Sequence, residues 1–308
     1  MSVLFVCFAV ALAAGLVTWW MARTWWRVDA GAPHLTTGTI ESNVRRHVRV
    51  ARWLRAHVNA EMATGSLLVA LAVVAIVGGG LFGVILAMVR SHRGFTTFDT
   101  SAARFGAHHA THTSTQVLRT ITQAGGAYVI VPLAVVVGLI EARRLRSWAT
   151  AAFLVVVVGG QYLLADVIKA IVDRARPNLL RLTGFSGPSF PSGHATAAAA
   201  TFAAFALLLG RGRSPRTKAL LAALAVGSAV LISATRVMLG VHWLTDVVAG
   251  LLLGWTWFVI SSIAFGGRRL RFGAPLATAE RVTNDVTPSD DRPPSEGRAA
   301  VNSGARPA

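Results

Sequence analysis

Charged residues are scarce in this sequence, and acidic residues are the scarcest. Only 14% of the 308 residues are charged, with 13 Asp and Glu against 30 Lys and Arg, whereas 54% are hydrophobic. A soluble domain usually carries about a quarter charged residues, so this composition favours an integral membrane protein. Cys7 is the single cysteine, which excludes an intramolecular disulfide and a cysteine-based metal site.

The excess of basic residues gives a formal net charge of +17. In a soluble protein this charge would suggest a nucleic-acid partner. Here the basic residues stand in short runs between apolar stretches, which is typical of membrane topology. We therefore expect a lipid bilayer, and no nucleic acid, as the partner.

Seven apolar stretches reach or approach the roughly 20 residues that a membrane-spanning helix needs. They are residues 2–22, 66–89, 124–141, 148–168, 194–210, 219–236 and 243–265. The pattern predicts an all-α fold, a polytopic membrane helix bundle that begins with an N-terminal transmembrane helix over residues 1–22. A cleaved signal peptide is the alternative for the first stretch, but the tryptophans and arginines that follow it favour a retained helix anchored at the interface.

Two segments differ in composition from these stretches. In residues 40–62 apolar residues recur at helical spacing and arginines fill much of the rest. This pattern predicts a basic amphipathic helix on an anionic membrane surface, or else a solvated helix, and we assign residues 23–65 to this cytoplasmic segment. For residues 266–308 we expect a disordered cytoplasmic tail, because few large apolar residues are available to offset the entropy of ordering.

The distribution of basic residues also predicts an orientation. Placing the basic loops on the cytoplasmic side follows the known excess of Lys and Arg there. The parts that then face outward are the N-terminus and residues 91–123, 169–193 and 236–242. The outward 169–193 loop nevertheless carries four basic residues, Lys169, Arg174, Arg176 and Arg181. A functional anion site would account for this exception.

Three short motifs lie at the outward ends of the last four stretches. In the first motif, Lys169 is followed after six residues by Arg176 and Pro177. Lys169, Asp173 and Arg176 have helical spacing and would share one helix face, which Pro177 would end. The result would be two cations aimed at one spot, although a Lys and Arg pair at an interface can also be a simple snorkelling anchor.

The second motif is Pro191-Ser192-Gly193-His194, at the start of an alanine-rich helix. Ser192 is a candidate N-cap, and a helix N-terminus with a glycine is a natural anion site. His194 would stand in the first turn beside that site. A capped helix start with an interfacial histidine is the alternative.

The third motif is Thr235-Arg236, five residues, His242, three residues and Asp246. His242 and Asp246 are spaced i, i+4, so they would face the same way on a helix. A carboxylate that accepts a proton from one imidazole nitrogen fixes the tautomer and leaves the other nitrogen as a nucleophile. Asp246 lies at the edge of an apolar span, where an ionisable residue is a functional candidate, with a local ion pair as the alternative.

Together the motifs supply what phosphoryl transfer needs. The transferred group requires cations and amide donors for its oxygens, an in-line nucleophile, and an acid for the leaving oxygen. Three cations, two histidines, one carboxylate and one helix N-terminus map to the same face of the predicted membrane bundle.

In this order the motifs resemble those of the type 2 phosphatidic acid phosphatase family, which shares a core with vanadium haloperoxidases. The resemblance covers roughly residues 66–265 and implies a six-helix phosphatase core over that range. Thr235 stands where the family usually has Ser, so the hydroxyl is kept.

The resemblance also implies a role for each matching residue. The implied phosphate-binding residues are Lys169, Arg176, Ser192, Gly193 and Arg236. His242 would attack phosphorus and form a phosphohistidine, with Asp246 orienting the ring. His194 would protonate the leaving group and then activate water.

We therefore expect an enzyme that hydrolyses a lipid phosphate or diphosphate at the outer face of the cell membrane, without a cofactor or metal ion. Polyprenyl diphosphate, phosphatidate and phosphatidylglycerophosphate are candidate substrates, and the oligomeric state stays open. A lipid phosphotransferase with an acceptor other than water, a vanadate-dependent haloperoxidase and a non-catalytic scaffold are the alternatives.

A histidine cluster in the outward 91–123 segment is the remaining polar feature. His108, His109 and His112, with Asp99 nearby, could form a metal site. No cysteine is at hand to complete it, so a short amphipathic helix that covers the phosphate site is the favoured interpretation.

Overall fold

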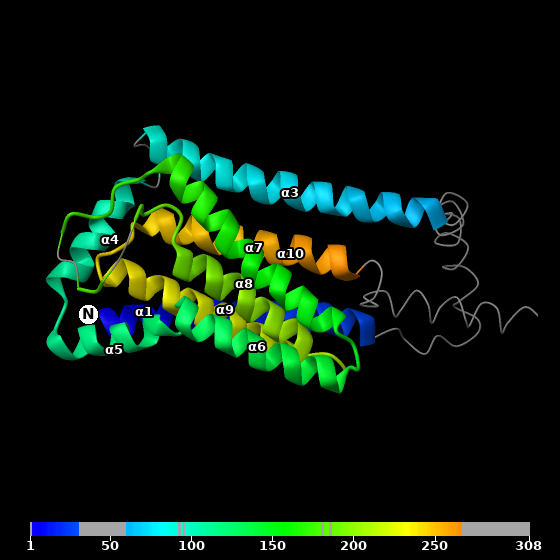
Figure 1. Ribbon diagram of the computed structural model, residues 1–308. Coiled ribbons are helices and arrows are strands. Elements are labelled where there is room, and N and C mark those ends of the chain that lie inside the picture. The colour runs from blue at the N-terminus through cyan, green and yellow to red at the C-terminus, as the bar shows by residue number, and fades with distance from the viewer. Residues whose placement is uncertain are drawn as a thin grey trace, which may run out of the picture. The chain divides into compact units, whose positions relative to one another are not determined.

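The computed structural model describes residues 2–30, 60–91, 94, 96–179, 182–184 and 187–266. The described residues all fall in the first of two units into which the chain divides, Met1–Arg269 and Leu270–Ala308. They form nine helices and no strand (Figure 1), namely α1 (Val3–Ala30), α3 (Ala60–Ser91), α4 (Thr96–His108), α5 (His112–Gln123), α6 (Ala127–Arg144), α7 (Ala149–Val172), α8 (Gly193–Leu209), α9 (Pro215–Met238) and α10 (Leu244–Gly266). The predicted all-α class is confirmed. Most of the predicted amphipathic helix at 40–62, and the predicted tail beyond residue 266, lie outside the described residues.

Each of the seven predicted apolar stretches coincides with a helix. Among the described residues, α7, α9, α10 and the Val3–Arg23 part of α1 are long and apolar enough to cross a membrane. The pair α5 and α6, bent by 41° at the intervening break, would add a fifth span. These five spans are fewer than the seven predicted stretches. The reasons are that α8 has only 17 residues and that only part of α3 is apolar and fully described. Since α8 packs against α6, α7, α9 and α10, it can be shorter than a helix that faces lipid.

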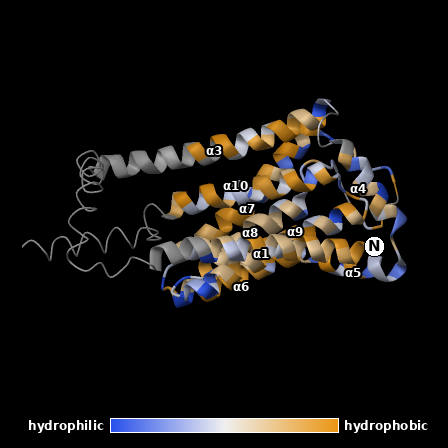
Figure 2. Cartoon of the chain, turned by 180° about the vertical axis from the view of Figure 1, so that it is seen from behind, coloured by the Kyte–Doolittle hydropathy of each residue, from blue (hydrophilic) through white to orange (hydrophobic). Residues whose placement is uncertain are grey.

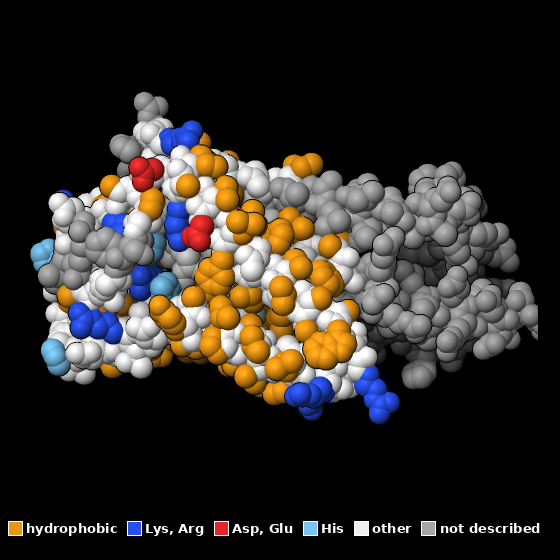
Figure 3. Space-filling model, viewed as in Figure 1, with side chains coloured by type: hydrophobic (Ala, Val, Ile, Leu, Met, Phe, Trp, Pro, Cys, Tyr) orange, Lys and Arg blue, Asp and Glu red, His pale blue; other side chains and the backbone are white. Residues whose placement is uncertain are grey.

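The surface of the bundle is apolar over the middle of the helices. Val155, Leu163 and Ile171 of α7 are large apolar residues that are 71%, 67% and 66% exposed. Apolar colour runs along the helices and polar colour gathers near their ends (Figure 2), and large apolar side chains cover the central surface in Figure 3. A surface of this kind would be unstable in water and fits a lipid environment.

Helix α8 forms the centre of the bundle, and its small side chains allow a close approach of α10. Ala195, Ala199 and Ala200 are completely buried. A Cβ atom built on Gly254 would lie 2.5 Å from the carbonyl oxygen of Thr196, and one on Gly250 would lie 2.7 Å from that of Ser192. Backbones that approach so closely are typical of membrane helices with small residues four apart. This contact fixes the start of α10 relative to the start of α8.

Helix α1 packs along α9 and is part of the same bundle. Gly15 and Gly227 face each other there, because a Cβ on Gly227 would lie 3.8 Å from the Cα of Gly15. Near its beginning, α1 buries Val3 and Cys7 in a cluster that includes Val241. The N-terminal helix therefore supports the chain just before His242, in addition to its predicted anchoring role.

The contact between α8 and α10 can be tested with Gly254→Ala. The added methyl must displace backbone atoms of α8, so we expect a loss of about 1–3 kcal/mol in stability, as for other overpacked sites. The measurement is the thermal unfolding midpoint in detergent. Gly159→Ala in α7 is the matched control, because a Cβ there meets nothing within 4 Å. Equal midpoints for the two variants would contradict the close packing.

Candidate active site

The three motifs meet at one end of the bundle, where α4 and α5 also lie (Figure 1). Lys169 is in the last turn of α7, Arg236 is in the last turn of α9, and Asp246 is in the first turn of α10. His194 is the second residue of α8, and Lys169, Arg176, Arg236 and His242 all lie within electrostatic range of its ring. The structure therefore brings together residues that are up to 77 positions apart in the sequence.

Lys169 occupies its predicted place, but Arg176 does not lie on the same helix. Helix α7 ends at Val172, and Asp173 follows in the left-handed conformation with φ of 44°. The prediction of one helix face for Lys169, Asp173 and Arg176 is therefore wrong, because the chain turns at Asp173 before it reaches Pro177. Lys169 Nζ is 3.0 Å from Asp166 Oδ1 and would be 3.3 Å from a Cβ on Gly193. The ammonium group thus lies over the first residue of α8.

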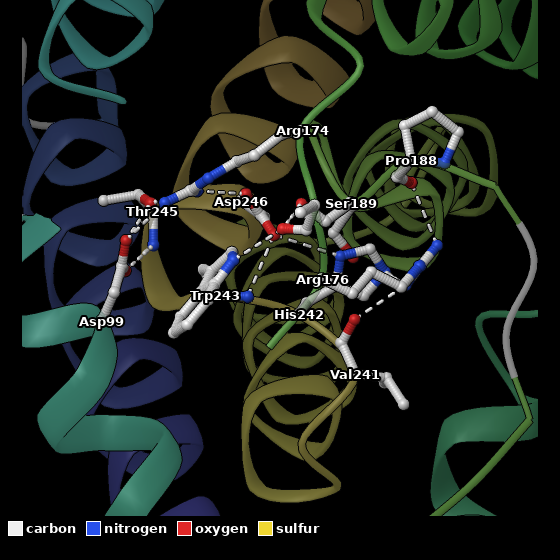
Figure 4. A network of polar contacts seen from close by, with 12 residues as sticks. Asp99, Arg174, Arg176, Pro188, Ser189, Val241, His242, Trp243, Thr245 and Asp246 are labelled. Atoms are coloured by element: carbon white, nitrogen blue, oxygen red, sulfur yellow. Dashed lines mark hydrogen bonds and ion pairs between the residues drawn. The ribbon is translucent and has the colours of Figure 1, made fainter. Parts of the chain in front are cut away.

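Arg176 reaches the site from the irregular segment between α7 and α8. Its guanidinium donates hydrogen bonds to the carbonyl oxygens of Gly187, Pro188 and Val241. Its Nη1 is also 3.1 Å from Nε2 of His242 (Figure 4). A guanidinium has only donors, so Nε2 must be the acceptor in this contact. The proton of the neutral His242 ring is then on Nδ1.

His242 is buried, and its Nδ1 faces the carboxylate of Asp246 at 3.5 Å from Oδ2. That distance is longer than a normal hydrogen bond, while Oδ2 accepts a bond of 2.9 Å from the backbone N–H of Trp243. Burial lowers the pKa of His242 to about 4, although Asp246 acts in the opposite direction. The ring is therefore neutral near pH 7, with its lone pair on Nε2.

Ser192 stands at the N-cap position of α8, as predicted, but its hydroxyl does not cap the helix. Ser192 Oγ is buried and makes no hydrogen bond with any residue in the described part of the chain. The backbone N–H of Ser192 donates to the carbonyl oxygen of Asp246 at 3.0 Å. The start of α8 is thereby joined to α10, and the hydroxyl can serve an anion.

Arg236 is buried and holds the following loop in place. Its carbonyl oxygen accepts hydrogen bonds from the backbone N–H groups of Val241 and His242. These bonds hold the chain in a tight turn between Arg236 and His242. Its Nη1 donates to Thr122 Oγ1 of α5 at 3.2 Å. The hydroxyl of Thr235, which stands where the family usually has Ser, donates a hydrogen bond to the carbonyl oxygen of Ile232 in its own helix at 2.6 Å.

Several supporting residues were not predicted. Asp166 pairs with Lys169, Thr122 with Arg236, and Asp99 with Arg174. Asp99 was considered only as a metal ligand, whereas His108, His109 and His112 are exposed and, among the described residues, no group of three His, Cys, Asp or Glu side chains could hold a metal ion. Among these supporting residues, only Asp99 left a signal in the sequence, because it is an acidic residue in a polar segment, 91–123, that otherwise lacks acids.

Comparison with known proteins gives a consistent family. The family model described as "PAP2 superfamily" matches residues 150–269. Lipid A 1-phosphatase of Rhizobium etli is 38% identical over 156 residues, which are 46% of this chain and 62% of the relative. This chain thus spans about three fifths of the length of that relative. Phosphatidylglycerophosphatase B of Bacillus subtilis is 33% identical over 141 residues, which are 45% of this chain and 69% of the relative.

A solved structure shows the same architecture. The crystal structure of a transmembrane PAP2 type phosphatidylglycerolphosphate phosphatase from Bacillus subtilis matches with a TM-score of 0.59 and 28% identity, covering 64% of this chain and 98% of that chain. The named relatives are phosphatases, which agrees with the predicted enzyme class. With the three motifs assembled at one site and these similarities in sequence and fold, the chain belongs to the PAP2 superfamily.

Proposed function

We propose that this protein is a membrane lipid phosphatase that transfers the phosphoryl group of a lipid phosphate or diphosphate first to His242 and then to water. The observation that carries the proposal is the contact between Arg176 and Nε2 of His242. It leaves Nε2 without a proton and places a cation beside the nucleophile. An incoming phosphate can bind the Arg176 guanidinium in place of His242. It then lies within reach of the lone pair on Nε2.

The first half of the reaction forms a phosphohistidine. Phosphate oxygens bind to the side chains of Lys169, Arg176 and Arg236, the hydroxyl of Ser192 and the amide of Gly193. Nε2 of His242 forms a bond to phosphorus while the bond from phosphorus to the leaving oxygen breaks, and His194 gives that oxygen a proton. Asp246 stabilises the positive charge that develops on the His242 ring.

The second half releases phosphate. His194 takes a proton from water, the water oxygen attacks phosphorus, and the electron pair of the P–N bond returns to Nε2. We further propose that the site faces the outside of the cell membrane. Basic residues cluster at the opposite end of the bundle, where Arg144 pairs with Glu141 and donates to the carbonyl oxygen of Arg211, as expected for a cytoplasmic end.

The nucleophile can be tested with His242→Ala. We expect phosphate release to fall by roughly 1,000-fold or more, as for other enzymes that lose a covalent nucleophile. The measurement is phosphate release from a lipid phosphate in detergent micelles. His109→Ala, at an exposed ring on α4–α5 that stacks on Phe105, is the control and should leave the rate unchanged. Near-normal turnover by His242→Ala would exclude this mechanism.

The second histidine can be tested with His194→Ala and an activated ester such as p-nitrophenyl phosphate. This leaving group needs no proton, so the phosphohistidine should still form, but its hydrolysis lacks a base. We therefore expect acid-labile, base-stable phosphate to accumulate on His194→Ala and to be absent from His242→Ala. Absence of label from both variants would count against the assigned roles.

The substrate can be identified with a panel of lipid phosphates and diphosphates that includes polyprenyl diphosphate, phosphatidate and phosphatidylglycerophosphate. We expect hydrolysis to continue in EDTA, because the proposed steps use only side chains and backbone amides. Adding alcohols as acceptors separates hydrolysis from transfer, since a phosphotransferase would form a new phosphate ester in place of inorganic phosphate.

A further inference from the structure

Asp99 in the first turn of α4 is an unusual residue, because an acidic side chain is only 2% exposed there. Helix α4 lies outside the region that matches the family model, residues 150–269. A buried carboxylate is unfavourable unless it is paired and hydrogen-bonded. The partners of Asp99 therefore indicate why the residue is there.

Those partners lie beside the proposed nucleophile. Asp99 Oδ1 accepts the backbone N–H of Thr245 at 2.8 Å, and Oδ2 accepts the Thr245 hydroxyl at 2.7 Å. Oδ2 also accepts a bond of 2.9 Å from Arg174 Nη2. Thr245 immediately precedes Asp246. Asp99 therefore binds the chain next to the carboxylate that faces His242 (Figure 4).

Besides the link through Thr245, the side chain of Arg174 connects Asp99 to Asp246. Its Nη1 donates to Asp246 Oδ1 and, at 2.8 Å, to the hydroxyl of Thr245. Its guanidinium carbon lies 5.5 Å from the ring centroid of Trp243, whose backbone N–H binds the other oxygen of Asp246. Both oxygens of Asp246 are thus held, and Oδ2 is directed towards His242.

The charges give this arrangement a further consequence. One arginine lies between two carboxylates, so the three side chains together carry one negative charge. A neutral residue at position 99 would leave Arg174 paired with Asp246 alone. Because Arg174 is shared with the Asp99 carboxylate, Asp246 keeps more of its negative charge for the His242 ring at the moment when that ring becomes positive.

We propose that Asp99 is a positioning residue for the reaction, which acts through Arg174 and Thr245 to aim Asp246 at His242 and to preserve the negative charge of Asp246. The proposal rests on the proposed phosphohistidine mechanism. Asp99 touches no reacting atom, so its effect should fall on the chemical step and not on substrate binding.

The test compares Asp99→Asn with Glu141→Gln. Glu141 is equally buried and also pairs with an arginine, Arg144, but it lies at the other end of the bundle. We expect Asp99→Asn to slow phosphohistidine formation in single turnovers by about 10- to 100-fold, as for small misplacements of reacting groups, with KM nearly unchanged. Glu141→Gln should lower the thermal midpoint to a similar degree and leave the rate per folded molecule unchanged.

A double-mutant cycle identifies the path of the effect. If Asp99 acts through Asp246, adding Asp99→Asn to Asp246→Asn should slow the reaction little further, because coupled residues are not additive. Arg174→Lys keeps the charge but loses the rigid planar fork that holds both carboxylates in one geometry, so it should reproduce the loss in kcat even if Asp99→Asn folds poorly.

Three results would overturn the proposal. These are a normal single-turnover rate in folded Asp99→Asn, full additivity with Asp246→Asn, and a normal kcat in Arg174→Lys. Failure of the proposed function would look different, because the wild-type protein itself would then form no phosphohistidine with any lipid phosphate, and the positioning role would fall with it.

Discussion

Positive charge concentrated at one end of an apolar bundle is the constraint on which this structure depends. Lys169, Arg174, Arg176 and Arg236 approach one another there, and burying like charges together is unfavourable. The protein holds them in two ways. Carboxylates bind Lys169 and Arg174, whereas carbonyl oxygens hold Arg176 and a threonine hydroxyl holds Arg236. Carbonyl and hydroxyl dipoles orient a guanidinium without cancelling its charge, so these two side chains keep the positive charge that the proposed phosphate site needs.

The same positive charge acts on His242, the proposed nucleophile. Burial and two nearby arginines hold the pKa of His242 well below its ordinary range, to about 4, so the ring is neutral and nucleophilic. Asp246 cannot raise that pKa enough to protonate the ring, but it can support the charge that appears during attack. This balance requires α8 and α10 to be close, and the glycines at 250 and 254 provide the space. Packing between small residues in the middle of the bundle therefore determines the geometry at its end.

The sequence was sufficient for the class of fold and for the motif residues that meet at one end of the bundle, because both leave local signals. Apolar stretches of about 20 residues mark membrane helices, and the motif residues have fixed spacings. It was misleading for Arg176, since helical spacing continued past Asp173 while the chain turned there. Residues such as Asp99 and Thr122 could not be assigned, because their partners lie 75 and 114 positions away and tertiary contacts of this kind leave no periodic pattern.

The part of the bundle that matches the family model and the helices outside it contribute to the site in different ways. All residues assigned to phosphate binding and catalysis lie within residues 150–269, the part that matches the family model. Helices α4 and α5 lie outside it, yet each holds one of those residues: α4 holds Asp246 through Asp99, and α5 holds Arg236 through Thr122. A shift of α4 or α5 would therefore move a carboxylate on one side of the site or a cation on the other. Because these helices also cover the end of the bundle where the motifs meet, a lipid that displaced them on entry would alter the alignment of the reacting groups.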